Sequence, residues 1–116
     1  MAPTIIEDTS GRFLMSLGGS GGSRIFGSVF QVILHIASGK DVRTAVEAGR
    51  VHDQLFPLLV DVDNVISAEM VEALRNRGHN VSVSDVNGVK AVVNTVIREG
   101  DRIYGANRPP FTCEIY

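Results

Sequence analysis

Hydrophobic and polar positions alternate near both ends of the chain and recur at helical spacing in the middle. Residues 3–6 and 12–17 are apolar-rich runs joined by a polar turn that ends in Gly11, the usual signal of a β-hairpin. Residues 89–97 and 102–106 form a similar pair around a Glu-Gly-Asp turn. The chain is therefore expected to begin and end in antiparallel hairpins.

The most apolar stretch, residues 25–38, has the period of an α-helix. The core-facing positions are expected to be Ile25, Val29, Val32, Ile33 and Ile36. Because Phe26, Phe30 and Leu34 occupy most of the rest, we expect this helix to be buried on more than one side. Its only polar stripe contains Ser28, Gln31, His35 and Ser38.

Capping residues mark two further helices. Gly39 fits the end of the first helix, and Asp41 fits the N-cap of a short helix through residue 48. Ser67 fits the cap of a third helix that runs to residue 77 and stops at Gly78. The core-facing residues of this third helix are expected to be Met70, Val71 and Leu74.

Short apolar runs at residues 58–62 and 81–84 predict two more strands, with a loop at 49–57 and a turn at 85–88. The expected order is β-β-α-α-β-α-β-β-β, with antiparallel hairpins enclosing a buried apolar helix. This order indicates an α+β fold rather than an alternating βαβ array.

Composition narrows the class of protein. The chain has 116 residues, 44% hydrophobic and 21% charged, with a net charge of -2, so one small domain is expected. Near-neutral charge argues against a dedicated nucleic-acid binder. Cys113 is the only cysteine, which excludes an internal disulfide framework and a multi-cysteine metal site. No apolar run approaches the roughly 20 residues of a membrane helix, and no signal peptide is visible, so localisation stays open.

Residues 18–23 read Gly-Gly-Ser-Gly-Gly-Ser and lead into the apolar helix. Such a stretch is not expected to form regular structure, and it frees backbone N–H groups to converge beside a helix N-terminus. The P-loop pattern fails at Ser23-Arg24, and the dinucleotide pattern fails at Arg24. The stretch is then a carboxylate or phosphate site, an oxyanion hole, or a tight turn without a ligand.

Residues 17–25 resemble the LGSPGGSRI segment of gamma-glutamyltransferases, also called glutathione hydrolases. Residues 45–54 are similar to the AVxAPRxHHQ stretch of that family, and residues 1–5 resemble the segment that follows its paired serines. The resemblance runs in order through nearly the whole chain and is weak after Arg98.

This resemblance implies a partial αββα sandwich of the N-terminal-nucleophile hydrolase class, with residues 1–116 as a single, incomplete small-subunit domain. In the family, an N-terminal threonine attacks a gamma-glutamyl amide, and water or an amino acid then takes the acyl group. The resemblance assigns the oxyanion-hole N–H groups to Gly21 and Gly22. It places Met1 and Ser20 at the substrate, which would be glutathione or another gamma-glutamyl compound.

The chain also departs from the family pattern. The 116 residues contain neither the threonine segment nor the paired serines, and Gly19-Ser20 replaces the family's Ser-Pro. We therefore expect a truncated homologue that is inactive alone, without cofactor or metal, with the missing large-subunit half as its partner. The alternatives are a non-catalytic interaction module, a split-enzyme partner, or a small anion-binding domain built on the glycine stretch.

Other candidate residues have simpler interpretations. His35 is expected to be a core histidine with a hydrogen-bonding neighbour. His52, Asp53 and His79 match no common metal-site spacing. Nothing in the sequence pairs Cys113 with a base, so a nucleophilic role is not indicated.

Overall fold

The computed structural model describes residues 1–84 and 91–107 and divides the chain into two compact units. The first unit joins Met1–Glu47 to the chain from Ala91 onward, and the second is Ala48–Lys90. The predicted turn at 85–88, the first two residues of the strand predicted at 89–97, and Cys113 lie outside the described residues.

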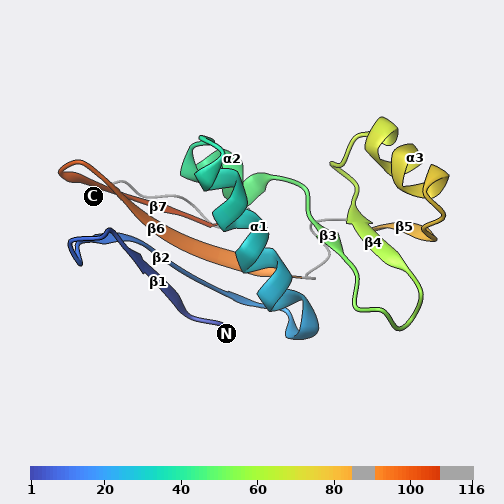
Figure 1. Cartoon of the computed structure of the whole chain (residues 1–116), viewed down its shortest axis with the longest axis horizontal. Helices are drawn as coiled ribbons and strands as arrows, with labels where there is room; N and C mark the ends of the chain where they lie inside the picture. The colour runs from blue at the N-terminus through green and yellow to red at the C-terminus, as the bar shows by residue number, and fades with distance from the viewer. Residues whose placement is uncertain (85–90, 108–116) are drawn as a thin grey trace. The chain divides into compact units, whose positions relative to one another are not determined.

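The first unit combines a four-stranded sheet with two helices and a 3₁₀ turn (Figure 1). Its elements are β1 (Thr4–Glu7), β2 (Phe13–Ser20), η1 (Gly22–Arg24), α1 (Ile25–Ala37), α2 (Val42–Glu47), β6 (Val92–Glu99) and β7 (Arg102–Ala106). The strands lie in the order β1-β2-β6-β7, and every neighbouring pair is antiparallel. The two predicted hairpins are confirmed, and β2 and β6 join them in one sheet.

The register of the sheet separates its two faces. One row runs across β2, β6 and β7 through Leu17, Thr95 and Ala106, all buried. Because side chains alternate along a strand, the next row lies on the opposite face. That row runs through Ile5, Ser16, Val96 and Gly105.

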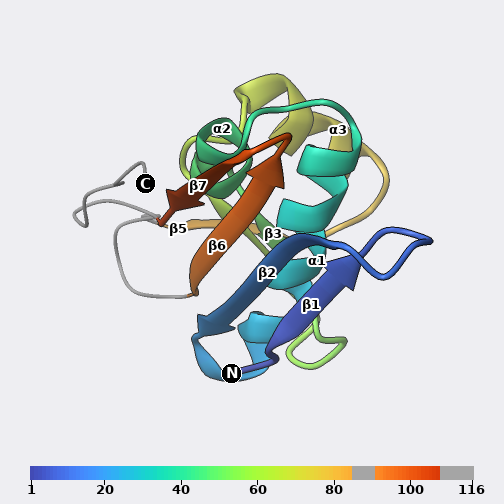
Figure 2. The ribbon, with the colours of Figure 1, turned by 90° about the vertical axis from the view of Figure 1, so that its left-hand side faces the viewer.

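Both helices of the first unit cover the same face of the sheet, as Figure 2 shows. The core there combines buried side chains of the sheet, such as Leu17 and Val93, with Val29, Val32 and Val46 from the helices. The helix spacing therefore predicted the buried stripe of α1 correctly. The other face of the sheet has no helix over it in the described part of this unit.

The expectation that α1 is buried on more than one side is wrong for these residues. Phe26, Phe30 and Leu34 are 78%, 52% and 51% exposed, because a spacing of four residues places them together on the side away from the sheet. Ser28, assigned to the polar stripe, is instead buried against the core. The apolar helix thus presents one stripe to the sheet and a second to the outside.

Capping explains where α2 begins. Asp41 Oδ1 accepts a hydrogen bond from the Thr44 N–H at 3.0 Å, and the Thr44 hydroxyl donates to Asp41 Oδ2 at 2.6 Å. The bond from this hydroxyl is the main reason that the pKa of the Asp41 carboxyl lies below its ordinary value. The predicted cap is confirmed.

The second unit is a three-stranded sheet with one helix. It contains β3 (Val51–His52), β4 (Val60–Asp63), α3 (Ala68–Asn76) and β5 (Val81–Ser84), in the order β3-β4-β5. β4 and β5 are parallel and joined through α3, so this unit contains a βαβ crossover that the sequence pattern missed. β3 also lies within the predicted loop, because two residues are too few to show a period.

α3 begins as predicted, since the Ser67 hydroxyl accepts a hydrogen bond from the Met70 N–H at 3.2 Å. Val71 is buried and Leu74 packs against the same cluster, which includes Val60 and Val62 of β4. Met70 is 53% exposed, so its assignment to the core was wrong. A nine-residue helix on a small sheet buries only a narrow stripe.

Candidate functional site

The glycine stretch is partly regular, against expectation. Gly18, Gly19 and Ser20 continue β2 and are paired with β6. A side chain at Gly19 would place its Cβ 2.8 Å from a backbone carbonyl oxygen of β6, so glycine is what lets the two strands approach. The Gly19 N–H donates to the Met1 carbonyl oxygen at 2.9 Å, which holds the start of the chain beside this end of β2.

The chain leaves the sheet at Gly21 and Gly22. Their φ angles are 133° and 62°, in the region that glycine tolerates best. Their carbonyl oxygens accept hydrogen bonds from the N–H groups of Arg24 and Ile25 in the 3₁₀ turn. Both glycines are exposed, and within residues 1–84 and 91–107 no hydrogen bond from either N–H group is found. Two consecutive backbone donors are therefore left for an external acceptor.

The N-terminus of α1 lies directly after this turn. It has no capping hydrogen bond from a side chain, and its first turn contains no acidic residue. The N-terminal N–H groups of a helix and its macrodipole favour negative charge. This end of the helix therefore adds to the attraction that the two glycine donors exert on an anion.

A hollow of about 220 Å³ lies beside the last residues of β2. It is lined by Met1, Pro3, Gly18, Gly19, Ser20 and Asn94. The structure thus brings Met1 and Ser20 to one hollow, next in sequence to the exposed glycines. Sequence reasoning missed Asn94, because its place opposite Gly18 depends on the pairing of β2 with β6, which no local pattern shows.

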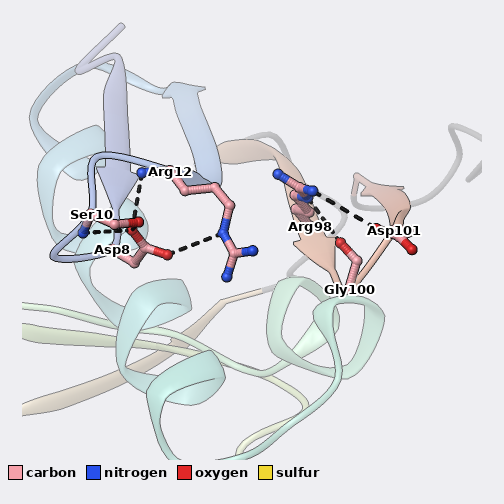
Figure 3. A network of polar contacts seen from close by, with 6 residues as sticks. All are labelled: Asp8, Ser10, Arg12, Arg98, Gly100 and Asp101. Carbon is pink, nitrogen blue, oxygen red and sulfur yellow. Dashed lines mark hydrogen bonds and ion pairs between the residues drawn. The ribbon is translucent and has the colours of Figure 1, made fainter.

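Charged side chains gather in two hairpin turns at the opposite end of this sheet (Figure 3). Asp8 accepts from the Ser10 hydroxyl and from the N–H of Arg12, and the Arg12 guanidinium lies 3.2 Å from its carboxylate. The pKa of Asp8 is held well below its ordinary value, chiefly by the hydrogen bond from the Ser10 hydroxyl. In the other turn, Arg98 donates to the Gly100 carbonyl oxygen at 2.9 Å. These charges belong to the turns and not to the glycine end.

The remaining candidates do not join this site. His35 is half-buried on α1, and it has an interaction partner. His52 is bonded to Gln54 at 3.1 Å in the second unit. Across the described residues, no three His, Cys, Asp or Glu side chains are grouped closely enough to hold a metal ion. In the same part of the chain, no helix has both the length and the apolar character needed to cross a membrane.

Comparison with models of protein families shows to which family the chain belongs. Residues 1–110 match the family model described as gamma-glutamyltranspeptidase. The chain belongs to this family. The predicted resemblance to this family is thereby confirmed.

Curated relatives and solved structures agree with this membership. The chain is 36% identical over 104 residues to glutathione hydrolase proenzyme 1 of Schizosaccharomyces pombe and 29% identical over 110 residues to the Escherichia coli proenzyme. These matches cover 89% and 94% of the chain but only 16% and 18% of the relatives. The chain therefore spans about a sixth of the length of these two relatives.

The fold matches gamma-glutamyltranspeptidases of the N-terminal-nucleophile hydrolase class. The chain superimposes on the Helicobacter pylori enzyme, solved as its T380A mutant, with a TM-score of 0.82 and 27% identity. It superimposes equally well on the Pseudomonas nitroreducens enzyme complexed with L-DON, with 28% identity. The superposition on the H. pylori enzyme includes 94% of this chain and 60% of that one. The superposition on the P. nitroreducens enzyme includes 97% of this chain and 58% of that one.

Proposed function

We propose that these 116 residues supply the oxyanion hole for gamma-glutamyl acyl transfer, from glutathione or a similar compound to water or an amino acid. The proposal depends on the N–H groups of two exposed residues, Gly21 and Gly22, which have no acceptor in the described part of the chain. Family membership supports the reaction class.

The chemistry requires donors at the atom where charge develops. When a nucleophile attacks the carbonyl carbon of a gamma-glutamyl amide, the carbonyl oxygen becomes an oxyanion. Two backbone N–H groups that converge on this oxygen would stabilise the charge without reorganising, and the N-terminus of α1 would add its dipole. The hollow lined by Met1 and Ser20 would hold the part of the substrate next to the reacting carbonyl.

We further propose that the 116-residue polypeptide alone does not turn over its substrate. Its glycine donors lower a barrier only if a nucleophile attacks, and its threonines lie outside the context in which the family places its nucleophile. The rest of the family fold, including the large-subunit half, would have to complete the site. Residues 1–116 would then act as a single, incomplete domain of that enzyme.

A chimera tests the assignment. In the S. pombe proenzyme, the segment matched by this chain is replaced with the chain's own residues, and release of a chromogenic gamma-glutamyl anilide is measured. We expect the chimera to be active and Gly22→Ala to lower kcat, because a Cβ at a φ of 62° strains the turn and displaces the N–H group. The loss should not exceed about 10² to 10³, the effect of removing one oxyanion donor entirely. The isolated 116 residues should give no release above background.

Gly100→Ala is the matched control. Gly22 and Gly100 have φ angles of 62° and 61°, and a Cβ at either position meets nothing within 4 Å. Both substitutions therefore carry similar backbone strain, whereas only Gly22 belongs to the candidate site. Equal losses of kcat would contradict the assignment, and turnover by the isolated chain would contradict the proposed inactivity.

The same backbone donors also support a second candidate function, that of a small anion-binding domain without catalytic activity. In that case the isolated chain would bind phosphate or glutamate with measurable heat, and Gly22→Ala would weaken the binding. The chimera would then lack activity although it folds. Calorimetry and the activity assay together separate the two candidates.

A further inference from the structure

The second unit contains one sequence motif that the candidate site does not use. Residues 80–82 read Asn-Val-Ser, the acceptor pattern for N-linked glycosylation, with a residue other than proline in the middle. None of the other asparagines in the 116 residues is followed two positions later by serine or threonine. Short patterns of this kind also occur by chance, so the surroundings of Asn80 decide whether it can carry a glycan.

Asn80 lies in the connection between α3 and β5, where a large substituent has room. It follows Gly78 and His79, and all three residues are exposed. α3 ends here because Gly78 adopts a φ of 89°, and the N–H of His79 donates to the Leu74 carbonyl oxygen at 3.2 Å. Acceptors of N-linked glycans lie in surface loops of this kind.

The backbone of Asn80 is held in place, whereas its side chain is available. Its carbonyl oxygen accepts a hydrogen bond from the N–H of Val60 at 2.8 Å, which fixes the residue at the start of β5. Within residues 1–84 and 91–107, no hydrogen bond to or from its carboxamide is found. Modification of the carboxamide nitrogen therefore breaks no hydrogen bond of the described fold.

We propose that Asn80 is an acceptor for N-linked glycosylation. Its Nδ2 attacks C1 of an oligosaccharide carried on a polyprenyl diphosphate, on a transferase that recognises the Ser82 hydroxyl. The N–C1 bond forms, the C1–O bond to the diphosphate breaks, and the diphosphate leaves with the electron pair of that bond. One amide proton passes to the transferase, so the step needs no oxidant or reductant. The modification does not depend on the proposed role of the glycine donors.

A glycan at this position would also protect an edge of the sheet. Among the described strands, β5 pairs only with β4, and it begins directly after Asn80. The backbone groups of an edge strand can pair with another chain, and Val83 on β5 adds an apolar side chain that is 51% exposed. A bulky, hydrophilic oligosaccharide beside this edge hinders such pairing.

Expression of the 116-residue chain in S. pombe behind a cleavable secretory signal tests the acceptor, because the transfer takes place in the lumen of the secretory pathway. The chain is recovered from cells and medium together, so a variant that fails to fold is still measured. We expect a form of lower electrophoretic mobility that peptide N-glycosidase F converts to the unmodified mobility. This enzyme converts a glycosylated asparagine to aspartate, and mass spectrometry after digestion in heavy-oxygen water should locate the conversion at residue 80.

The folded state is tested on the same material. Because the carboxamide makes no hydrogen bond in the described fold, the glycosylated chain and the Asn80→Gln chain should have the same urea midpoint. A lower midpoint of the glycosylated chain would contradict the open setting on which the proposal rests.

Substitutions within the motif decide the assignment. Asn80→Gln should abolish the slower form, and so should Ser82→Ala, which keeps the asparagine and removes only the hydroxyl, whereas Ser82→Thr should retain it. Asn76→Gln is the matched control, because Asn76 is also exposed but has Gly78 two positions later. The proposal is overturned if the unsubstituted chain gives no slower form. It is also overturned if that form survives Asn80→Gln or Ser82→Ala, or disappears in Asn76→Gln.

Discussion

The core of the first unit contains one hydroxyl that should destabilise it. Thr95 is 2% exposed, on the helix-covered face of β6, and its Oγ1 has no hydrogen-bond partner within the described residues. Its neighbours across the sheet, Leu17 and Ala106, offer only apolar side chains. A buried hydroxyl that finds no partner costs about 1–3 kcal/mol relative to its hydrated state.

Thr95→Val removes this cost and keeps the shape of the side chain. We expect the free energy of unfolding to rise by about 1 kcal/mol, the lower end of that range. The buried hydroxyl is replaced by a methyl group, which packs against the apolar neighbours of residue 95. For a domain of this size the rise corresponds to about 4 °C in Tm. Urea denaturation should show a higher midpoint with an unchanged m-value.

Val93→Thr is the inverse control, two residues along β6 on the same face and 0% exposed. It inserts a buried hydroxyl and should lower the free energy of unfolding by about 1–3 kcal/mol. The reasoning is refuted if Thr95→Val is destabilising or if Val93→Thr is neutral. Either result would mean that a hydroxyl on this face finds a partner.

Three further outcomes follow from local geometry. Gly19→Ala should force β2 and β6 apart and lower the free energy of unfolding by about 1–3 kcal/mol, measured by urea denaturation. A Cβ at Gly18 makes only ordinary contacts, so Gly18→Ala should lower it less. The Thr44 hydroxyl lowers the folded-state pKa of Asp41, so this carboxylate stabilises the fold above its unfolded pKa of about 3.9. The contribution disappears as the pH falls through the folded-state pKa. Asp41→Asn should therefore flatten that part of a curve of Tm against pH. Ser67→Ala should cost about 1 kcal/mol by removing the cap of α3, again measured by urea midpoint.

Local sequence signals predicted most of the elements. Capping at Asp41 and Ser67, and the periodicity of residues 25–37, depend on contacts within a few residues, so the sequence contains them directly. The apolar period also marked the buried stripe of α1. It did not show that the second apolar stripe, at Phe26, Phe30 and Leu34, would be exposed, because the burial of that stripe depends on elements far away in the chain.

Long-range pairing accounts for the errors. Gly18 and Gly19 look like loop residues by propensity, yet they are strand residues because β6 pairs with them and leaves no space for a side chain at Gly19. The parallel pair β4 and β5 was missed for the same reason. In the candidate site, the glycine donors were visible in the sequence, whereas Asn94 becomes a neighbour of Ser20 only through the register of two distant strands.

The order in which the chain is synthesised has a consequence for this sheet. β2 pairs with β6, which follows only after the entire second unit, so the first hairpin leaves the ribosome long before its neighbour exists. Closing a loop of this length costs on the order of 4 kcal/mol of chain entropy. If residues 48–90 fold first, the ends of that loop are drawn closer and less of this entropy remains to be lost. Early folding of the inserted segment would then accelerate assembly of the strands on either side of it.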